Sequence, residues 1–252
     1  FAATIWAFLK SIQKGSTAWI ITTFVFFALA LGTKFNIIFI PLILLPYLLV
    51  KYKSKFPAVN IKKYVPALMM GAVLVSLIFF GSWPYLWQNW PGNFLSIVEF
   101  YKGIGTGTNY QPDNFFILGF NIFPLLWIIT TAPPLVLILF ALGFIVAILK
   151  RDEKPFGVLL VLWFMVPVLR VAVPGSTIYG GIRQIMEFLP AMALLAGFGA
   201  SQVVYWFKSM KMSILTVQIF LILLFAWPVF IITKLHPNEN VYFNSFIGGL
   251  SG

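Results

Sequence analysis

Cysteine is absent from this chain, and histidine occurs only once, at His236. The lack of cysteine excludes disulfide bonds and leaves the redox compartment open. A single histidine cannot build a metal centre, and no acidic cluster accompanies it. We therefore expect no tightly bound metal or other cofactor held by the protein itself. A divalent cation shared between substrate and carboxylate remains open for the complete protein.

Charge is also scarce, since only 9% of the 252 residues are charged while 61% are hydrophobic and the mean hydropathy is +0.97. This composition excludes a water-soluble domain and is typical of a multi-pass membrane protein. The net charge of +11 would suggest nucleic acid in a soluble protein. Here the basic residues lie in short segments between apolar runs, so we expect the bilayer as a partner and no nucleic acid.

The apolar runs predict an all-α, polytopic bundle of seven to eight transmembrane helices, because each span needs about 20 residues. We assign residues 1–233 to this membrane domain and 234–252 to the start of an extracytoplasmic C-terminal region. The small residues Ala193, Gly197 and Ser201 recur at a spacing of four, which predicts a face for close helix packing. The expected spans are 1–9, 19–31, 37–50, 64–81, 130–149, 156–173, 185–207 and 214–233.

The segment 83–123 is predicted to be one long extracytoplasmic loop. Its clustered tryptophans suit headgroup depth, and residues 115–127 are predicted to form an amphipathic helix on the membrane surface. The following Thr130-Thr131-Ala132-Pro133-Pro134 is predicted to begin a span, with a hydroxyl cap and proline in the first turn.

The basic residues predict the orientation of the chain. Twelve of the 17 lie in alternate connections, at 10–14, 51–63, 150–154 and 208–211. By the positive-inside rule these connections face the cytoplasm. We expect the protein to lie in the plasma membrane. The loop 83–123, the turn 174–184 and the C-terminal tail are then extracytoplasmic. Because the chain begins at Phe1 within an apolar run and ends in a polar stretch, we also expect it to be an internal piece of a longer protein, without its first spans.

The stretch from Tyr179 to Pro190 contains two charged residues at the start of a long apolar run, where charges are costly to place. Arg183 and Glu187 are spaced i, i+4, which predicts a shared helix face. Arginine offers a planar fork of donors for phosphate oxygens, and Glu187 would orient it or contact a sugar hydroxyl. The alternative is a structural ion pair at the membrane edge, with Arg183 reaching the headgroups. Tyr179, at the start of the stretch, is a further candidate for substrate contact.

Four other charged residues are weaker candidates. Arg170 and Lys34 lie on the same predicted side as Arg183, either as further cations over one anion or as interfacial anchors. Glu99 and Asp113 are the acidic residues of the segment 83–123. A transfer reaction needs a general base, which a carboxylate suits, although loop acids are usually only solvated.

Several short motifs, taken in order, resemble bacterial membrane glycosyltransferases of the dolichyl-phosphate-mannose protein mannosyltransferase type, also called the C-type fold. The motifs are Gly32-Thr33-Lys34, Trp83-Pro84-Tyr85-Leu86-Trp87, Thr131-Ala132-Pro133-Pro134, Tyr179-Gly180-Gly181-Ile182-Arg183, a helix with Phe188-Leu189-Pro190 and Ala193-Leu194-Leu195-Ala196-Gly197, and a tail with 236–244 and Gly248-Gly249.

This resemblance implies transfer of a sugar from a polyprenyl-phosphate carrier to a protein, lipid or cell-wall glycan. It implies Lys34, Arg170 and Arg183 on the side of the carrier phosphate, and a catalytic acid near the N-terminus of the complete protein, outside this chain. Two other classes stay open. A transporter or flippase predicts charges around a central cavity, whereas a non-catalytic assembly subunit predicts that Arg183 and Glu187 contact only each other.

Overall fold

The computed structural model describes residues 1–52, 61–105, 115–151, 155–176, 178–211, 213–238 and 242–249. These residues are almost entirely helical and divide into two compact units, Phe1–Asn109 and Tyr110–Gly252. The expectation of an all-α protein is therefore confirmed. Each unit has its own core and is described by itself.

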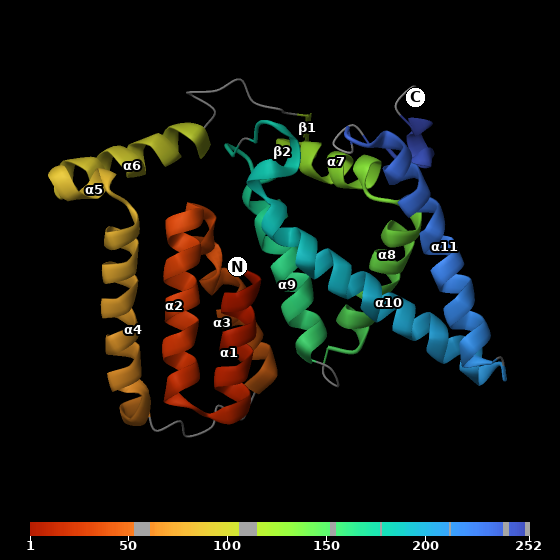
Figure 1. Cartoon of the computed structure of the whole chain (residues 1–252), viewed down its shortest axis with the longest axis horizontal. Helices are drawn as coiled ribbons and strands as arrows, with labels where there is room; N and C mark the ends of the chain where they lie inside the picture. The colour runs from red at the N-terminus through yellow and green to blue at the C-terminus, as the bar shows by residue number, and fades with distance from the viewer. Residues whose placement is uncertain are drawn as a thin grey trace. The chain divides into compact units, whose positions relative to one another are not determined.

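Unit 1 consists of helices that run side by side, with two further helices, α5 and α6, after the end of α4. They are α1 (Ala2–Lys14), α2 (Thr17–Thr33), the 3-10 helix η1 (Phe35–Phe39) with α3 (Pro41–Tyr52), α4 (Ile61–Ser82), the short α5 (Tyr85–Gln88) and α6 (Trp90–Gly105). Helix α2 packs on α1 and α4, and α6 runs crosswise to α4 (Figure 1). The buried residues include Ile5, Ala7, Ala28, Ile37 and Ile43.

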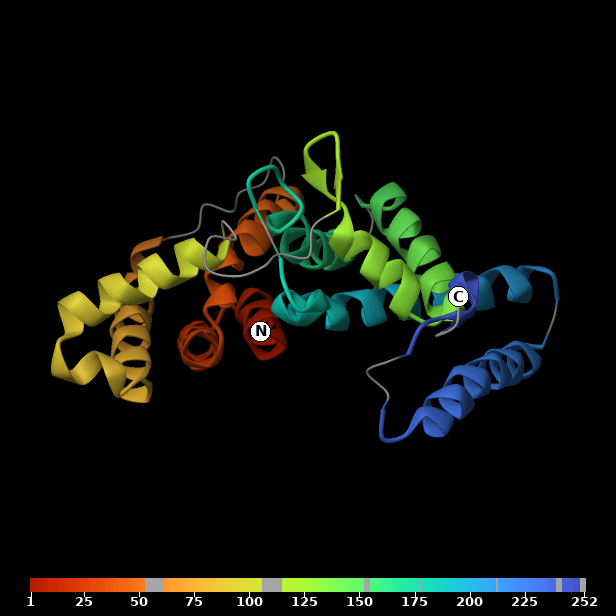
Figure 2. The same cartoon turned by 90° about the horizontal axis from the view of Figure 1, so that it is seen from above.

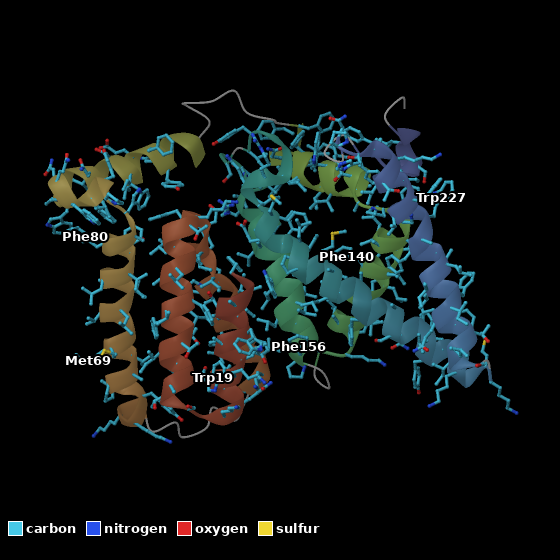
Figure 3. All side chains as sticks on the ribbon, viewed as in Figure 1. Trp19, Met69, Phe80, Phe140, Phe156 and Trp227 are labelled. Carbon is cyan, nitrogen blue, oxygen red and sulfur yellow. The ribbon has the colours of Figure 1, made fainter. Side chains whose placement is uncertain are left out.

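Glycine allows α2 and α4 to approach closely. A Cβ atom built on Gly71 of α4 would lie against the ring of Phe24, and one on Gly32 of α2 would lie 2.6 Å from Ser82 Oγ. The outer side of α4 is unpacked, and Met69 there is 67% exposed (Figure 3). Such an apolar, unpacked side is what a bilayer would cover.

Unit 2 begins with a small hairpin, β1 (Phe116–Ile117) and β2 (Phe120–Asn121), paired antiparallel. The helices are α7 (Phe123–Thr131), α8 (Pro134–Leu149), α9 (Pro155–Arg170), the 3-10 helices η2 (Gly181–Gln184) and η3 (Met186–Phe188), α10 (Leu189–Ser209), α11 (Ile214–Leu235) and the 3-10 helix η5 (Ser245–Ile247). Helix α10 passes obliquely across α8 and α9, and α11 turns back from its end (Figures 1 and 2).

Helices α8, α9 and α10 form the core of unit 2. Phe140 of α8 and Phe164 of α9 have ring centroids 4.5 Å apart, and Phe188 meets Phe164 edge-on at 5.6 Å. Helices α8 and α10 touch through Gly143 and Gly199. A Cβ on either glycine would overlap the backbone of the other helix.

The packing face predicted for α10 is wrong. Ala193, Gly197 and Ser201 are exposed, and a Cβ on Gly197 would meet nothing within 4 Å. The buried face instead carries Ala191, Leu195 and Gly199. Both sets have a spacing of four, but they lie two residues apart and thus on nearly opposite sides of the helix.

Within the described residues, four helices are long and apolar enough to cross a membrane, namely Phe35–Tyr52, Lys62–Ser82, Met186–Ser209 and Ile214–Leu235. Three more apolar helices in this part of the chain are shorter, namely Thr17–Thr33, Pro134–Leu149 and Pro155–Arg170. A helix of 16 residues is about 24 Å long, less than the hydrocarbon thickness of about 30 Å. Four candidate spans are therefore established here, and the larger number remains a prediction.

Two expectations for the segment 83–131 are wrong. Residues 115–127 do not form one helix, because β1 and β2 precede a helix that begins only at Phe123. Thr130 and Thr131 end α7, with their hydroxyls donating to Trp127 O, rather than capping the next helix. Proline in the first turn of α8 is confirmed. Much of 83–105 is helical as α5 and α6, so this part is not an irregular loop.

Candidate functional site

Residues 171–188, which contain Arg183, connect α9 to α10 in unit 2 and are called the stretch from here on. Hydrogen bonds and apolar contacts hold its backbone in place. Ala172 O accepts a hydrogen bond from Asn121 N at 2.9 Å, which joins the stretch to the hairpin. Ile178 and Ile185 are fully buried along it. The stretch is therefore anchored by apolar side chains at two points, with its polar residues between them.

An ion pair fixes the C-terminal part of the stretch to α9. Arg170 Nη2 lies 3.4 Å from Glu187 Oε1 and also donates to Gln184 O at 3.1 Å. Trp163, two turns earlier on α9, donates from Nε1 to Glu187 O at 2.8 Å. The Glu187 side chain is only 7% exposed, so it needs this cation beside it. Arg170 and Glu187 thus act first as a structural clamp.

Arg183 has a different position from the one its spacing predicts. It lies in η2, whereas Glu187 lies in η3, and Ile185 between them leaves helical geometry at φ −120°. Arg183 and Glu187 therefore do not share one continuous helix face. Arg183 is exposed, and its Nε donates to Gly180 O at 3.0 Å.

The turn before Arg183 needs two glycines. Gly180 and Gly181 have φ values of 67° and 66°, a left-handed conformation that side chains disfavour. A Cβ on Gly180 would collide with the Arg183 guanidinium, and one on Gly181 would lie 3.3 Å from Trp127 of α7. The turn consequently presents the arginine side chain folded against bare backbone, at the surface of unit 2.

The structure brings two of the predicted site residues together, Arg170 and Glu187. Tyr179, which is half-buried, and the exposed Arg183 belong to the same segment between α9 and α10. Lys34 belongs to unit 1, where it is exposed at the end of α2. Glu99 is exposed on α6 of unit 1. Asp113 lies outside the described residues.

Residues that the sequence did not single out support this site. Asn121 is fully buried, and its Oδ1 accepts from Phe115 N and Phe123 N, both at 3.1 Å, which closes the hairpin and begins α7. Trp163 supports Glu187, and a spacing of seven from Arg170 places both on one face of α9. That spacing was visible in the sequence, but the target of the indole was not.

The C-terminal segment is anchored to unit 2 through Asn244. Its Nδ2 donates to Ile129 O at 2.5 Å and Ala132 O at 2.8 Å, and its Oδ1 accepts from Phe246 N at 3.0 Å. Phe243 meets Trp127 edge-on at 5.7 Å. Trp127 thus lies between the C-terminal segment and the glycine turn at Gly181.

An apolar cavity of about 600 Å³ lies between α8, α11 and the C-terminal segment. Its lining includes Leu135, Trp227 and Tyr242 and carries no charged side chain. Within the described parts of the chain, no three His, Cys, Asp or Glu side chains are grouped closely enough to hold a metal ion. The cavity offers space for an apolar chain, while the available cationic chemistry lies at Arg170 and Arg183.

Comparison of this chain with models of protein families, with curated proteins and with solved structures finds no match.

Proposed function

We propose that this protein is a membrane glycosyltransferase that transfers a sugar from a polyprenyl-phosphate carrier to an extracytoplasmic protein, lipid or glycan acceptor, with Arg183 binding the carrier phosphate. The observation that carries the proposal is the exposed Arg183 on a double-glycine turn, beside a stretch clamped by Arg170 and Glu187. The ion pair of Arg170 and Glu187 holds the backbone in place, and the Arg183 side chain lies exposed at the surface, folded over the glycine turn. The ordered set of motifs in the sequence supports the same class of enzyme.

In the proposed reaction, the role of this stretch is to place a positive charge beside the leaving phosphate. The acceptor oxygen attacks the anomeric carbon, the bond from that carbon to the phosphate oxygen breaks, and a base takes the acceptor proton. The phosphate leaves with increased negative charge, which a fixed guanidinium stabilises. Glu99 and Asp113 are the candidates for this base within the chain.

The proposal includes the finer topology predicted from the sequence. The three shorter apolar helices join the four long ones as seven spans, the run 1–9 is the end of an eighth, and the basic connections face the cytoplasm. Residues 83–123, the stretch 174–184 and the tail then face outward. Arg170 and Arg183 follow the end of α9 that lies opposite its basic connection at 150–154, which supports a site on the outer side.

The assembly-subunit alternative predicts that Arg183 and Glu187 contact each other and nothing else. Glu187 forms an ion pair with Arg170 at 3.4 Å, so its contacts extend beyond Arg183. This ion pair supports a role for Glu187 in holding the fold, while the exposed Arg183 is proposed to bind a ligand. The transporter alternative requires charges around a central cavity, whereas the cavity described between α8, α11 and the C-terminal segment is lined by uncharged residues.

The test is donor binding and label transfer by the protein in lipid, with a radiolabelled polyprenyl-phosphate sugar. We expect Arg183→Ala to reduce both by at least about tenfold, which corresponds to about 1.4 kcal/mol. Arg183→Lys should retain part of the binding, because lysine keeps the charge but not the fork of donors. Arg151→Ala, an exposed arginine in the basic connection before α9, is the matched control. Unchanged binding by folded Arg183→Ala would make Arg183 an interfacial anchor.

A further inference from the structure

Besides the cavity in unit 2, the structure has an apolar groove of about 770 Å³ in unit 1. The proposed reaction does not use this groove. It extends along α1, α2 and α3 and reaches the start of α4. Its deep part is lined by apolar side chains, among them Phe8, Phe27 and Leu44, and by the hydroxyls of Ser11 and Thr23. Its other end is formed by Gly15, Tyr52, Lys63 and Tyr64, where α1 and α3 end and α4 begins.

Lysines gather around that second end. Lys63 lines the groove and its Nζ lies 5.4 Å from the ring centroid of Tyr64. Lys51 Nζ lies 5.6 Å from the ring of Tyr52, which also lines the groove. Lys14, next to Gly15, lies 5.6 Å from the ring of Trp19. Lys63 thus lines the opening itself, while Lys51 and Lys14 are sequence neighbours of the lining residues Tyr52 and Gly15, and each of the three ammonium groups lies over an aromatic ring.

The charge of this region is one-sided. Residues 1–98 contain eight lysines and no aspartate or glutamate. The anion that balances these lysines must therefore come from outside this part of the chain. An apolar groove that opens among lysines between helices has the chemistry to hold an anionic phospholipid, with the acyl chain inside and the phosphate outside.

We infer that this groove binds one anionic glycerophospholipid from the leaflet next to the basic end of unit 1. One acyl chain lies along α1, α2 and α3, and the phosphate lies among Lys14, Lys51 and Lys63. This lipid is a resident of unit 1 and differs from the carrier proposed at Arg183. The inference depends on the groove and its charge, and it holds whether or not sugar transfer is correct.

The headgroup is tested by native mass spectrometry of the delipidated protein with added dioleoyl phosphatidylglycerol or dioleoyl phosphatidylcholine. We expect wild type to retain phosphatidylglycerol at least tenfold better, and the triple variant Lys14→Gln, Lys51→Gln, Lys63→Gln to lose most of that preference. The control is Lys150→Gln, Arg151→Gln, Lys208→Gln, which removes the same charge from unit 2 and should keep the preference. Equal retention of the two lipids by wild type, or an equal loss in the control, overturns the inference.

The acyl chain is tested separately, so that a variant that fails to fold does not decide the matter. Thr23→Phe fills the groove, whereas Thr22→Phe places the same ring one residue away on α2, outside the lining. We expect Thr23→Phe alone to weaken phosphatidylglycerol retention by about tenfold. Glycerol 1-phosphate, which has the headgroup phosphate without chains, should neither compete nor stabilise wild type against heat. Equal effects of the two variants, or full competition by glycerol 1-phosphate, overturn the chain site.

Discussion

At the scale of residues, the two arginines of unit 2 differ in surroundings although both follow from one stretch of sequence. The Arg170 side chain is 19% exposed and faces a carboxylate, whereas Arg183 is exposed and lies over a glycine turn. Interactions of an exposed cation contribute little to stability, while a nearly buried carboxylate is costly to leave without a cation beside it. Stability and binding are therefore expected to separate between the two sites.

Glu187→Gln tests this separation. Glutamine keeps the size of the side chain but removes the charge that faces Arg170, so we expect a loss of about 2 kcal/mol in the free energy of unfolding, typical of a hydrogen bond to a charged group. The measurement is thermal or denaturant unfolding in detergent. Arg183→Ala is the control and should change unfolding by less than about 0.5 kcal/mol. Equal destabilisation by both variants would contradict the assignment of the clamp to Arg170 and Glu187.

The sequence located this stretch but could not predict its pairs. The spacing of Arg183 and Glu187 predicts one continuous helix face, but the left-handed glycines and the break at Ile185 interrupt the helix. Arg170, which forms an ion pair with Glu187, is 17 residues away, at the end of another helix. Such a contact depends on the packing of α9 against the stretch, which no local pattern encodes.

At the scale of elements, the crossing of α8 and α10 depends on two glycines. A Cβ on Gly199 would meet Leu139 O and, at 2.9 Å, Gly143 N, and backbone atoms cannot move aside as a flexible side chain does. We expect Gly199→Val to destabilise unit 2 by about 3 kcal/mol or more, because the helices must separate. Gly197→Val, on the open side of the same helix, should be tolerated. The measurement is the free energy of unfolding of both variants. Similar losses of stability would mean that the helix propensity of valine, and not the helix crossing, causes the destabilisation.

Helix α6 has the pattern of a helix that lies in a membrane surface. Ile97 is buried against unit 1, and Tyr101 stacks on Phe35 of η1 at 5.0 Å. Phe94 is on this apolar side, whereas Glu99 is about 140° around the helix. Because the side that bears Phe94 is only partly covered by protein, the bilayer interface is expected to cover the rest.

Spin labels test the position of α6, and the absence of cysteine makes each label unique. In the protein reconstituted in vesicles, a nitroxide at Phe94→Cys should be relaxed mainly by oxygen, which concentrates in lipid. A nitroxide at Glu99→Cys should be relaxed mainly by a water-soluble nickel chelate. A label at Met69→Cys, on the exposed side of α4, gives the deep-lipid reference. Equal nickel accessibility at 94 and 99 would place α6 in water.

The sequence predicted elements well where they are uniformly apolar. The runs 64–81 and 214–233 became α4 and α11 with ends shifted by at most three residues, because a long apolar run in lipid has helix as its only satisfied backbone structure. The mixed segment 83–131 was predicted poorly. Its tryptophans, prolines and glycines are compatible with surface loops, and the tertiary contacts of Tyr101, Asn121 and Trp127 decide which parts become helix or hairpin.

At the scale of the whole molecule, the distribution of charge predicts the orientation of each unit in the membrane. In unit 1 the lysines near the ends of α1 and α3 oppose the end that carries Trp83 and Trp87. In unit 2 the basic residues between α8 and α9 oppose the stretch with Arg183. In each unit the sequence predicts that the basic ends of the helices face the cytoplasm. A shared sidedness is a requirement of the proposed enzyme, because donor and acceptor meet on one face.

Single cysteines decide the orientation of both units without altering any charge. We expect an impermeant maleimide to label Gln88→Cys of unit 1 and Ser176→Cys of unit 2 in intact cells. Gln13→Cys and Met210→Cys should react only after the membrane is permeabilised, because they lie in basic connections that resist translocation. The control for non-specific labelling is the unsubstituted chain, which has no cysteine to react with the maleimide. If Gln88 and Ser176 were labelled from opposite sides, the stretch around Arg183 could not share a compartment with the segment around α5 and α6. The proposed outward-facing transfer site would then be wrong, even if every helix crosses the membrane as expected.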